Sequence, residues 1–153
     1  MDKWSGGKNQ RANTVEIEEG NKMKPHDKRY YIKKLDDIFS QYIRLKYSKE
    51  GICECYTCGK RNRWQNMQCG HFFSRRYYAT RWDENNVRVQ CVSCNVFHEG
   101  EKIIFTQKLF KEIGAKKMQL LGIKKNNIVN VGIFELKTLI TLYENKRHKI
   151  ESG

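Results

Sequence analysis

Apolar residues recur every three or four positions in one stretch of the first third of the chain. They are Leu35, Ile38, Phe39, Tyr42 and Ile43. This period is that of an amphipathic α-helix, so the pattern predicts a helix from about residue 31 to residue 47. We expect the apolar stripe to face the protein core.

Two further stretches near the C-terminus carry the same helical period. The first covers residues 103–113 and stops at Gly114, a residue type that commonly ends helices, and a short helical turn follows up to Gly122. The second is predicted from about Phe134 to Lys146. Its expected buried stripe consists of Leu136, Leu139, Ile140 and Tyr143.

Between these helices, two short segments alternate in character from one residue to the next, as strands do. They are "QCGHFF", residues 68–73, and "NVRVQC", residues 86–91. We expect these two strands to pair. Residues 74–85 between them are predicted to form a long loop, and such loops in a compact unit are usually functional or disordered.

The charge balance points to a polyanionic partner. Thirty Lys and Arg residues against seventeen Asp and Glu residues give a formal net charge of +13. No apolar run approaches the roughly 20 residues of a transmembrane helix. No strongly apolar, basic amphipathic helix stands out either. Nucleic acid is therefore favoured over a membrane as the partner.

The N-terminal residues 1–29 are polar and charged, and we interpret them as a flexible basic arm. Because the first residues lack the apolar region of a secretory signal, the protein is expected in the cytoplasm, which is reducing. In that compartment six cysteines are metal ligands more often than disulfide partners.

Four of the cysteines have the spacing of a zinc site. Cys55 and Cys58 form one C-x2-C pair, and Cys91 and Cys94 form another. Two such pairs supply four thiolates to a tetrahedral Zn²⁺ in a closed, structural site. Cys53 is an alternative ligand, because it forms a C-x4-C pair with Cys58. We interpret the remaining residue, Cys69, as a small apolar residue on a strand, with a redox or ligand role as the alternative.

If four thiolates satisfy the zinc ion, His71 is not needed as a ligand and is available as a general base. Asn95 directly follows Cys94, where a helix is expected to begin. Its amide oxygen is a hard ligand that suits Mg²⁺ or Mn²⁺. Two strands and a helix that present a histidine and an asparagine toward a basic surface are the layout of a ββα-metal, or HNH, nuclease. Such an enzyme needs a base and a cation to hydrolyse a phosphodiester.

Four runs occur in the order "FSQYIRLKYSKEG", "CYTCGK", "QCGHFFSRR" and "TRWDENNVRVQCVSCN". With the helical C-terminal part, they resemble the NinG/Rap family of phage recombination endonucleases from about residue 35 to residue 147. The resemblance implies an α+β fold in which a small zinc-stabilised ββα-metal (HNH) unit is flanked by N- and C-terminal helices. A single nuclease domain would span residues 30–150, with a helix over 30–50, the zinc and ββα core over 51–100 and a helical part over 101–150.

The resemblance also implies an activity. The protein would be a metal-dependent, structure-specific DNA endonuclease that cleaves branched recombination intermediates such as Holliday junctions and D-loops. It would be encoded by a phage or prophage and act in the cytoplasm of a bacterial host. A homodimer would suit paired nicks on a symmetric junction.

By position, the resemblance assigns His71 as the general base and Asn95 as a ligand of the catalytic metal. Asn86 would hold the loop and orient His71. Many HNH nucleases have a metal-binding aspartate just before the histidine, but this sequence has Gly70 there. Candidates for the second ligand are Asp83 and His98, of which His98 lies one helical turn after Asn95. A solvent-exposed His98 near a helix start is the alternative.

The chain between positions 60 and 81 has several basic residues and no acidic one, which predicts a DNA-binding surface. The basic residues are Lys60, Arg61, Arg63, Arg75, Arg76 and Arg81. Arg75 and Arg76 follow the histidine strand and are expected to hold the scissile phosphate, with a solvated charged face as the alternative. The aromatic residues Tyr77, Tyr78 and Trp82 either stack on DNA bases or pack the loop.

Two other functions are compatible with the zinc pattern and the charge. One is a non-catalytic zinc-ribbon module that binds nucleic acid, and the other is a structural subunit that docks on a partner protein. His71 and Asn95 favour the nuclease, because a pure binding module needs neither residue.

Overall fold

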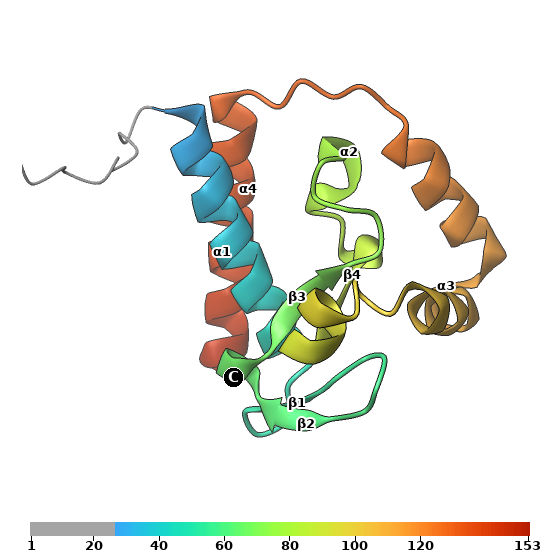
Figure 1. The fold of residues 1–153 in the computed structure, drawn as a ribbon. Coiled ribbons are helices and arrows are strands. Elements are labelled where there is room, and N and C mark those ends of the chain that lie inside the picture. The colour runs from blue at the N-terminus through green and yellow to red at the C-terminus, as the bar shows by residue number, and fades with distance from the viewer. Residues whose placement is uncertain (1–26) are drawn as a thin grey trace, which may run out of the picture.

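A computed structural model describes residues 27–153 (Figure 1). The fold is α+β, with long helices and two small antiparallel sheets. The arm predicted for residues 1–29 lies almost entirely outside the described residues, but Lys28 and Arg29 belong to the first helix. The helices and strands are α1 (Lys28–Lys46), β1 (Ile52–Glu54), β2 (Arg61–Arg63), β3 (Gln68–His71), α2 (Tyr78–Arg81), β4 (Val87–Gln90), α3 (Lys102–Lys125) and α4 (Ile133–Glu151).

Helix α1 forms where the apolar period predicted it. Asp27 caps its N-terminus by accepting a hydrogen bond from the Arg29 N–H at 2.9 Å. All five residues of the predicted stripe are buried, which confirms that this face of the helix lies in the core.

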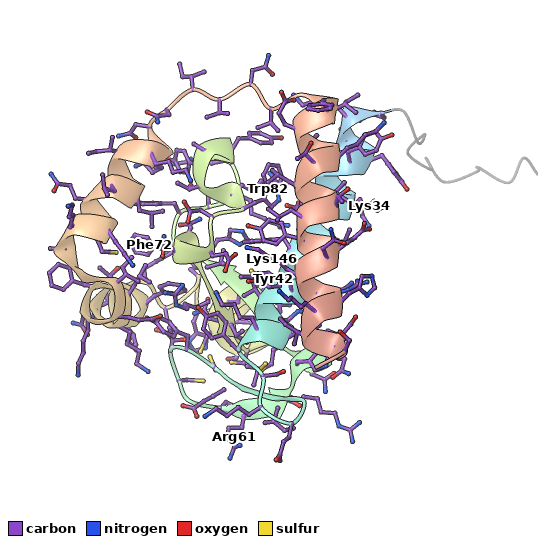
Figure 2. All side chains as sticks on the ribbon, turned by 180° about the vertical axis from the view of Figure 1, so that it is seen from behind. Lys34, Tyr42, Arg61, Phe72, Trp82 and Lys146 are labelled. Carbon is purple, nitrogen blue, oxygen red and sulfur yellow. The ribbon has the colours of Figure 1, made fainter. Side chains whose placement is uncertain are left out.

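Helices α1 and α4 lie side by side and run in the same direction (Figure 1). Glu84 joins them to the middle of the chain, because its carboxylate binds Lys46 at 2.6 Å, Lys146 at 2.7 Å and the Tyr42 hydroxyl at 3.0 Å. Figure 2 shows Tyr42 and Lys146 close together. The first and last described helices therefore form one wall of the molecule.

The predicted strand pair is confirmed, although both strands are shorter than expected. β3 and β4 are antiparallel, with Cys69 opposite Val89 and His71 opposite Val87. Side chains alternate between the two faces of this pair. Val87 and Val89 join the core cluster that contains the α1 stripe. The other sheet pairs β1 with β2.

The stretch predicted as a loop, residues 74–85, contains the short helix α2 and most of the 3-10 turn η2 (Glu84–Asn86). Contacts from distant helices stabilise this stretch. Trp82 is buried, its indole donates to Asp36 of α1 at 2.9 Å, and its carbonyl accepts from the Tyr143 hydroxyl of α4 at 3.1 Å.

The chain after β4 passes through a π-helical turn, η3 (Ser93–Phe97), into α3. The predicted break at Gly114 is confirmed, because this residue has φ 81° and ψ 165° inside α3. Before this break, Phe105 and Leu109 of α3 are buried, and the Phe105 ring contacts the rings of Tyr56 and Phe72. Glu112 pairs with Arg88 of β4 at 2.8 Å.

Helix α4 extends past its predicted end at Lys146. Leu136, Ile140 and Tyr143 of the expected stripe are buried, and Leu139 packs beside them. No helix within residues 27–153 is long and apolar enough to cross a membrane.

Candidate active site and metal centre

Four cysteine sulfurs gather where the two sheets meet η3. The Sγ atoms of Cys55, Cys58, Cys91 and Cys94 all lie within 4.8 Å of one another. Cys58 Sγ and Cys91 Sγ are 3.8 Å apart. Two sulfurs that are each about 2.3 Å from a tetrahedral zinc ion would lie about 3.8 Å apart. The cluster therefore suggests a structural zinc site.

The other candidate ligands lie outside this cluster. Cys53 is fully buried and its thiol donates to the Arg44 carbonyl at 3.0 Å. Cys69 is part of β3, where burial raises the pKa of its thiol to about 12. His71 is not a member of the cluster either.

The cluster thiols differ in how readily they ionise. Burial raises the pKa of Cys55, but hydrogen bonds from the Cys58 backbone and from Thr57 outweigh it and bring the pKa down to about 6. Burial raises the pKa of Cys94 to about 12. Four neighbouring thiolates need a cation to offset their charge, and a divalent zinc ion provides it.

A cleft of about 790 Å³ lies between α1, β3 and the segment from η3 to the start of α3. Four residues for which the sequence suggested a chemical role line it together: Cys69, His71, Arg75 and Asn95. The sequence did not point to the cleft residues Asp36, Gln68, Glu99 and Lys102. The histidine and the asparagine, 24 positions apart in the chain, thus share one solvent-accessible site.

The hydrogen bond of His71 determines which ring nitrogen carries the proton. Nε2 lies 3.0 Å from the Arg81 carbonyl oxygen. A carbonyl can only accept, so Nε2 donates and the lone pair of a neutral ring is on Nδ1. Burial lowers the pKa of His71 below its ordinary value, and the charge of Arg75 acts in the same direction, while the Arg81 carbonyl opposes them. The ring is therefore neutral at pH 7.

Asn86 is fully buried behind the histidine strand. Its Nδ2 donates to the carbonyls of Phe73 and Thr80, both at 2.9 Å, and its Oδ1 accepts from the Phe73 N–H at 2.8 Å. Phe73 is two residues after His71, and Thr80 immediately precedes Arg81. Asn86 therefore links Phe73 to Thr80, which lie near the two ends of the segment between His71 and Arg81.

Asn95 lies in η3, where its Nδ2 donates to Gln68 Oε1 at 2.6 Å. Glu99, four residues later, lines the same cleft. The two residues suggested from the sequence as second metal ligands do not line it. His98 is exposed and its Nδ1 lies 2.8 Å from Glu101, whereas Asp83 caps η2 and pairs with Lys124 at 2.6 Å.

The structure gives a reason for glycine before the histidine. A Cβ atom at Gly70 would lie 2.1 Å from Gln90 Oε1 and 2.8 Å from Gln90 Cδ. Gln90 is fully buried, and its Nε2 donates to Thr57 at 3.1 Å and to the Gly100 carbonyl at 3.0 Å. An aspartate at position 70 does not fit beside this fixed side chain.

The predicted DNA-binding residues fall into separate groups. Lys60, Arg61 and Arg63 are exposed on the β1–β2 hairpin, and Figure 2 shows Arg61 at the end of the molecule. Arg75 and Arg76 are exposed after β3, and Arg75 lines the cleft.

Arg81 is different, because its side chain is only 14% exposed. It pairs with Asp36 at 2.5 Å and donates to the Arg75 carbonyl at 2.8 Å. Of the loop aromatics, Trp82 is buried and contacts the Tyr78 ring edge-to-face at 5.9 Å, while the Arg76 guanidinium lies over the Tyr77 ring at 4.6 Å.

Comparison with known proteins identifies one family. The model of the family described as Bacteriophage Lambda NinG protein matches residues 6–152, nearly the whole chain. Neither the curated proteins nor the solved structures contain a match.

Proposed function

The chain belongs to the bacteriophage lambda NinG family, and from this premise we propose that it is a metal-dependent, structure-specific DNA endonuclease of the ββα-metal (HNH) type. Its substrates are branched recombination intermediates such as Holliday junctions and D-loops. The observation that carries this proposal is the cleft in which His71 and Asn95 meet, next to the four-cysteine cluster.

His71 is the general base of the proposed reaction. With its Nε2–H held by the Arg81 carbonyl, Nδ1 accepts the proton of the water that attacks the phosphodiester. A histidine that is neutral at pH 7 is ready for this role without first losing a proton. Asn86 is the residue that keeps the segment between His71 and Arg81 in place.

Asn95 and Glu99 are the residues that would hold a catalytic Mg²⁺ or Mn²⁺. Amide and carboxylate oxygens suit these ions, which are commonly bound by one or two carboxylates together with substrate phosphates. Among the described residues, the only group of three or more cysteine, histidine or acidic side chains close enough to hold a metal is the cysteine cluster. Oxygens of the DNA phosphate would complete the coordination of such an ion. When bound, the ion stabilises the charge that develops on the phosphate and on the leaving oxygen.

Positive charge around the cleft attracts the DNA backbone. Arg75 is exposed there, and the Lys102 ammonium lies within 3.0 Å of two carbonyl oxygens, those of His71 and Phe72. Neutral carbonyls do not cancel the charge of Lys102, so it remains available to a phosphate. We expect the protein to bind DNA in the cytoplasm of the bacterial host. A homodimer would place two clefts on the two sides of a symmetric junction.

DNA binding is expected to be salt-sensitive and largely independent of sequence. The double substitution Arg75→Ala with Arg76→Ala should weaken binding and make the slope of log K against log salt less negative, by roughly 0.9 for each lost phosphate contact. Fluorescence anisotropy across a salt series measures this slope. A matched control is Lys116→Ala with Lys117→Ala, which removes the same charge from exposed positions of α3 that do not line the cleft. An unchanged slope in the arginine variant would move the binding surface elsewhere.

The proposed activity is tested with purified, zinc-loaded protein and a synthetic four-way junction. In Mg²⁺ or Mn²⁺ we expect cleavage of the junction in preference to a linear duplex of the same sequence, and no cleavage when neither ion is added to the zinc-loaded protein. Protein that is folded and binds junctions but cuts no branched or linear DNA in either metal would instead be a non-catalytic zinc-ribbon module.

A further inference from the structure

Asp36 of α1 is the centre of a polar cluster at the wall of the cleft. Its carboxylate accepts from Arg81 Nε at 2.9 Å, from a terminal nitrogen of Arg81 at 2.5 Å and from the Trp82 indole at 2.9 Å. Arg75 approaches it to 3.8 Å. The side chains of Asp36 and Arg81 are only 16% and 14% exposed. A bidentate pair this well shielded from water has a fixed geometry.

The same arginine contacts the histidine through its backbone. The Arg81 carbonyl lies 3.0 Å from His71 Nε2. Its guanidinium is fixed at one side by Asp36 and at the other by the Arg75 carbonyl at 2.8 Å. The preceding carbonyl, that of Thr80, is bound by Asn86 at 2.9 Å. The position of the Arg81 carbonyl therefore depends on the Asp36 carboxylate, which belongs to α1 and not to the strand pair.

We propose that Asp36 is a positioning residue for His71: by holding Arg81, it keeps the proton of the imidazole on Nε2 and directs the lone pair of Nδ1 into the cleft. This inference rests on the proposed function of His71 as a base. It gives Arg81 a role inside the protein in place of the DNA contact expected from its charge.

The test is Asp36→Asn, with Glu144→Gln as its control. Glu144 is an acid of α4 that does not line the cleft, and its ion pair is with Lys34 at 3.6 Å. Loss of a side chain that orients a metal-bound histidine typically costs about 10- to 100-fold in activity, and we expect a similar factor for His71. Asp36→Asn should lower kcat for junction cleavage by that factor with little change in KM, and Glu144→Gln should resemble the wild type.

The pH profile separates positioning from a merely structural role. Burial and the charge of Arg75 disfavour the charged imidazole, while the backbone groups of Arg81 and Cys69 and the Asp36 carboxylate favour it. Asp36→Asn removes the carboxylate charge and releases the Arg81 carbonyl, so the pKa of His71 should fall and the acidic limb of the kcat profile should move to lower pH. A fall in kcat with an unmoved limb would contradict the proposal.

The tautomer of His71 gives a measurement that does not depend on cleavage. Nitrogen-15 shifts of zinc-loaded protein without Mg²⁺ should show the proton on Nε2 in the wild type and a mixture of tautomers in Asp36→Asn. If the wild-type protein cleaves no DNA, the proposed function fails while this result still decides the role of Asp36. A wild-type tautomer in Asp36→Asn would overturn the inference.

Arg81→Gln tests the same link from its other partner, because it removes the ion pair and keeps the backbone carbonyl. If the two side chains act through one contact, the double variant should lose no more activity than either single variant. Losses that multiply would show that Asp36 and Arg81 act separately, and would contradict the proposal even if Asp36→Asn proved poorly stable.

Discussion

Replacing Cys94 with serine is expected to unfold the middle of the molecule, from β1 to the start of α3. The four sulfurs join the turn between β1 and β2 to the end of β4 and to η3. Structural zinc sites contribute about 10–16 kcal/mol of apparent binding free energy. The whole stability of a domain is usually only about 5–15 kcal/mol. Losing one of the four thiolates should therefore cost much of the free energy of unfolding.

Zinc content by elemental analysis and thermal unfolding by circular dichroism measure this effect. We expect one zinc ion per wild-type chain and a loss of both zinc and the cooperative transition in Cys94→Ser. The matched control is Cys69→Ser, which makes the same chemical change in β3 at a cysteine outside the cluster. Its thiol is protonated at pH 7, since burial raises its pKa to about 12, so a neutral hydroxyl replaces a neutral thiol. Wild-type protein that is folded without zinc would contradict the prediction.

The parts of the fold that could be predicted are those in which burial repeats with a fixed period. The stripe of α1 and the alternation of β3 and β4 are visible in the sequence, because core contacts select apolar residues at regular positions. Helix α2 could not be predicted in this way. It depends on Asp36, which binds Arg81 and Trp82 from about 45 positions away in the chain.

The candidate site, too, could be predicted only where its residues follow a regular pattern. The spacing of the cysteines indicated the metal cluster, and a regular helix after Cys94 suggested His98 as the partner of Asn95. The structure instead has a π-helical turn there, followed by three consecutive residues with left-handed backbone: Glu99, Gly100 and Glu101, with φ of 50°, 83° and 49°. This conformation brings Glu99 to the cleft and leaves His98 outside it. Left-handed non-glycine residues are strained, and such strain often marks functional sites.

Substituting His71 with alanine is expected to lower junction cleavage by about two to four orders of magnitude, the usual contribution of a positioned general base. Zinc content, folding and junction binding should remain close to those of the wild type, because His71 lies outside the cysteine cluster. The matched control is His98→Ala, which removes an exposed imidazole close to Asn95 but outside the cleft. This control should cleave like the wild type. Single-turnover cleavage of a labelled junction gives the rates.

The pH dependence of wild-type cleavage should carry the signature of the same residue. Burial holds the pKa of His71 below its ordinary value, so cleavage should persist as pH falls to about 6.5 and decline only below it. The free energy of unfolding should also fall as pH falls. The unfolded chain binds the proton at higher pH than the folded one, so this histidine lowers stability as pH falls below about 6.5. His71→Ala should lack both the acidic limb and this loss of stability.

Other outcomes for His71→Ala would indicate other roles for His71. If the variant lost zinc or unfolded, the histidine would be a metal ligand or a core residue, and the nuclease proposal would lose its main support. If the variant folded, bound junctions and still cut them, another group would be the base. His98 would then be the first candidate, since it is three positions after Asn95 in the chain. The double variant would decide whether His98 provides the remaining activity. Cleavage that disappears in His71→Ala but survives in His98→Ala, with zinc and binding intact in both, is the result that a base at Nδ1 of His71 requires.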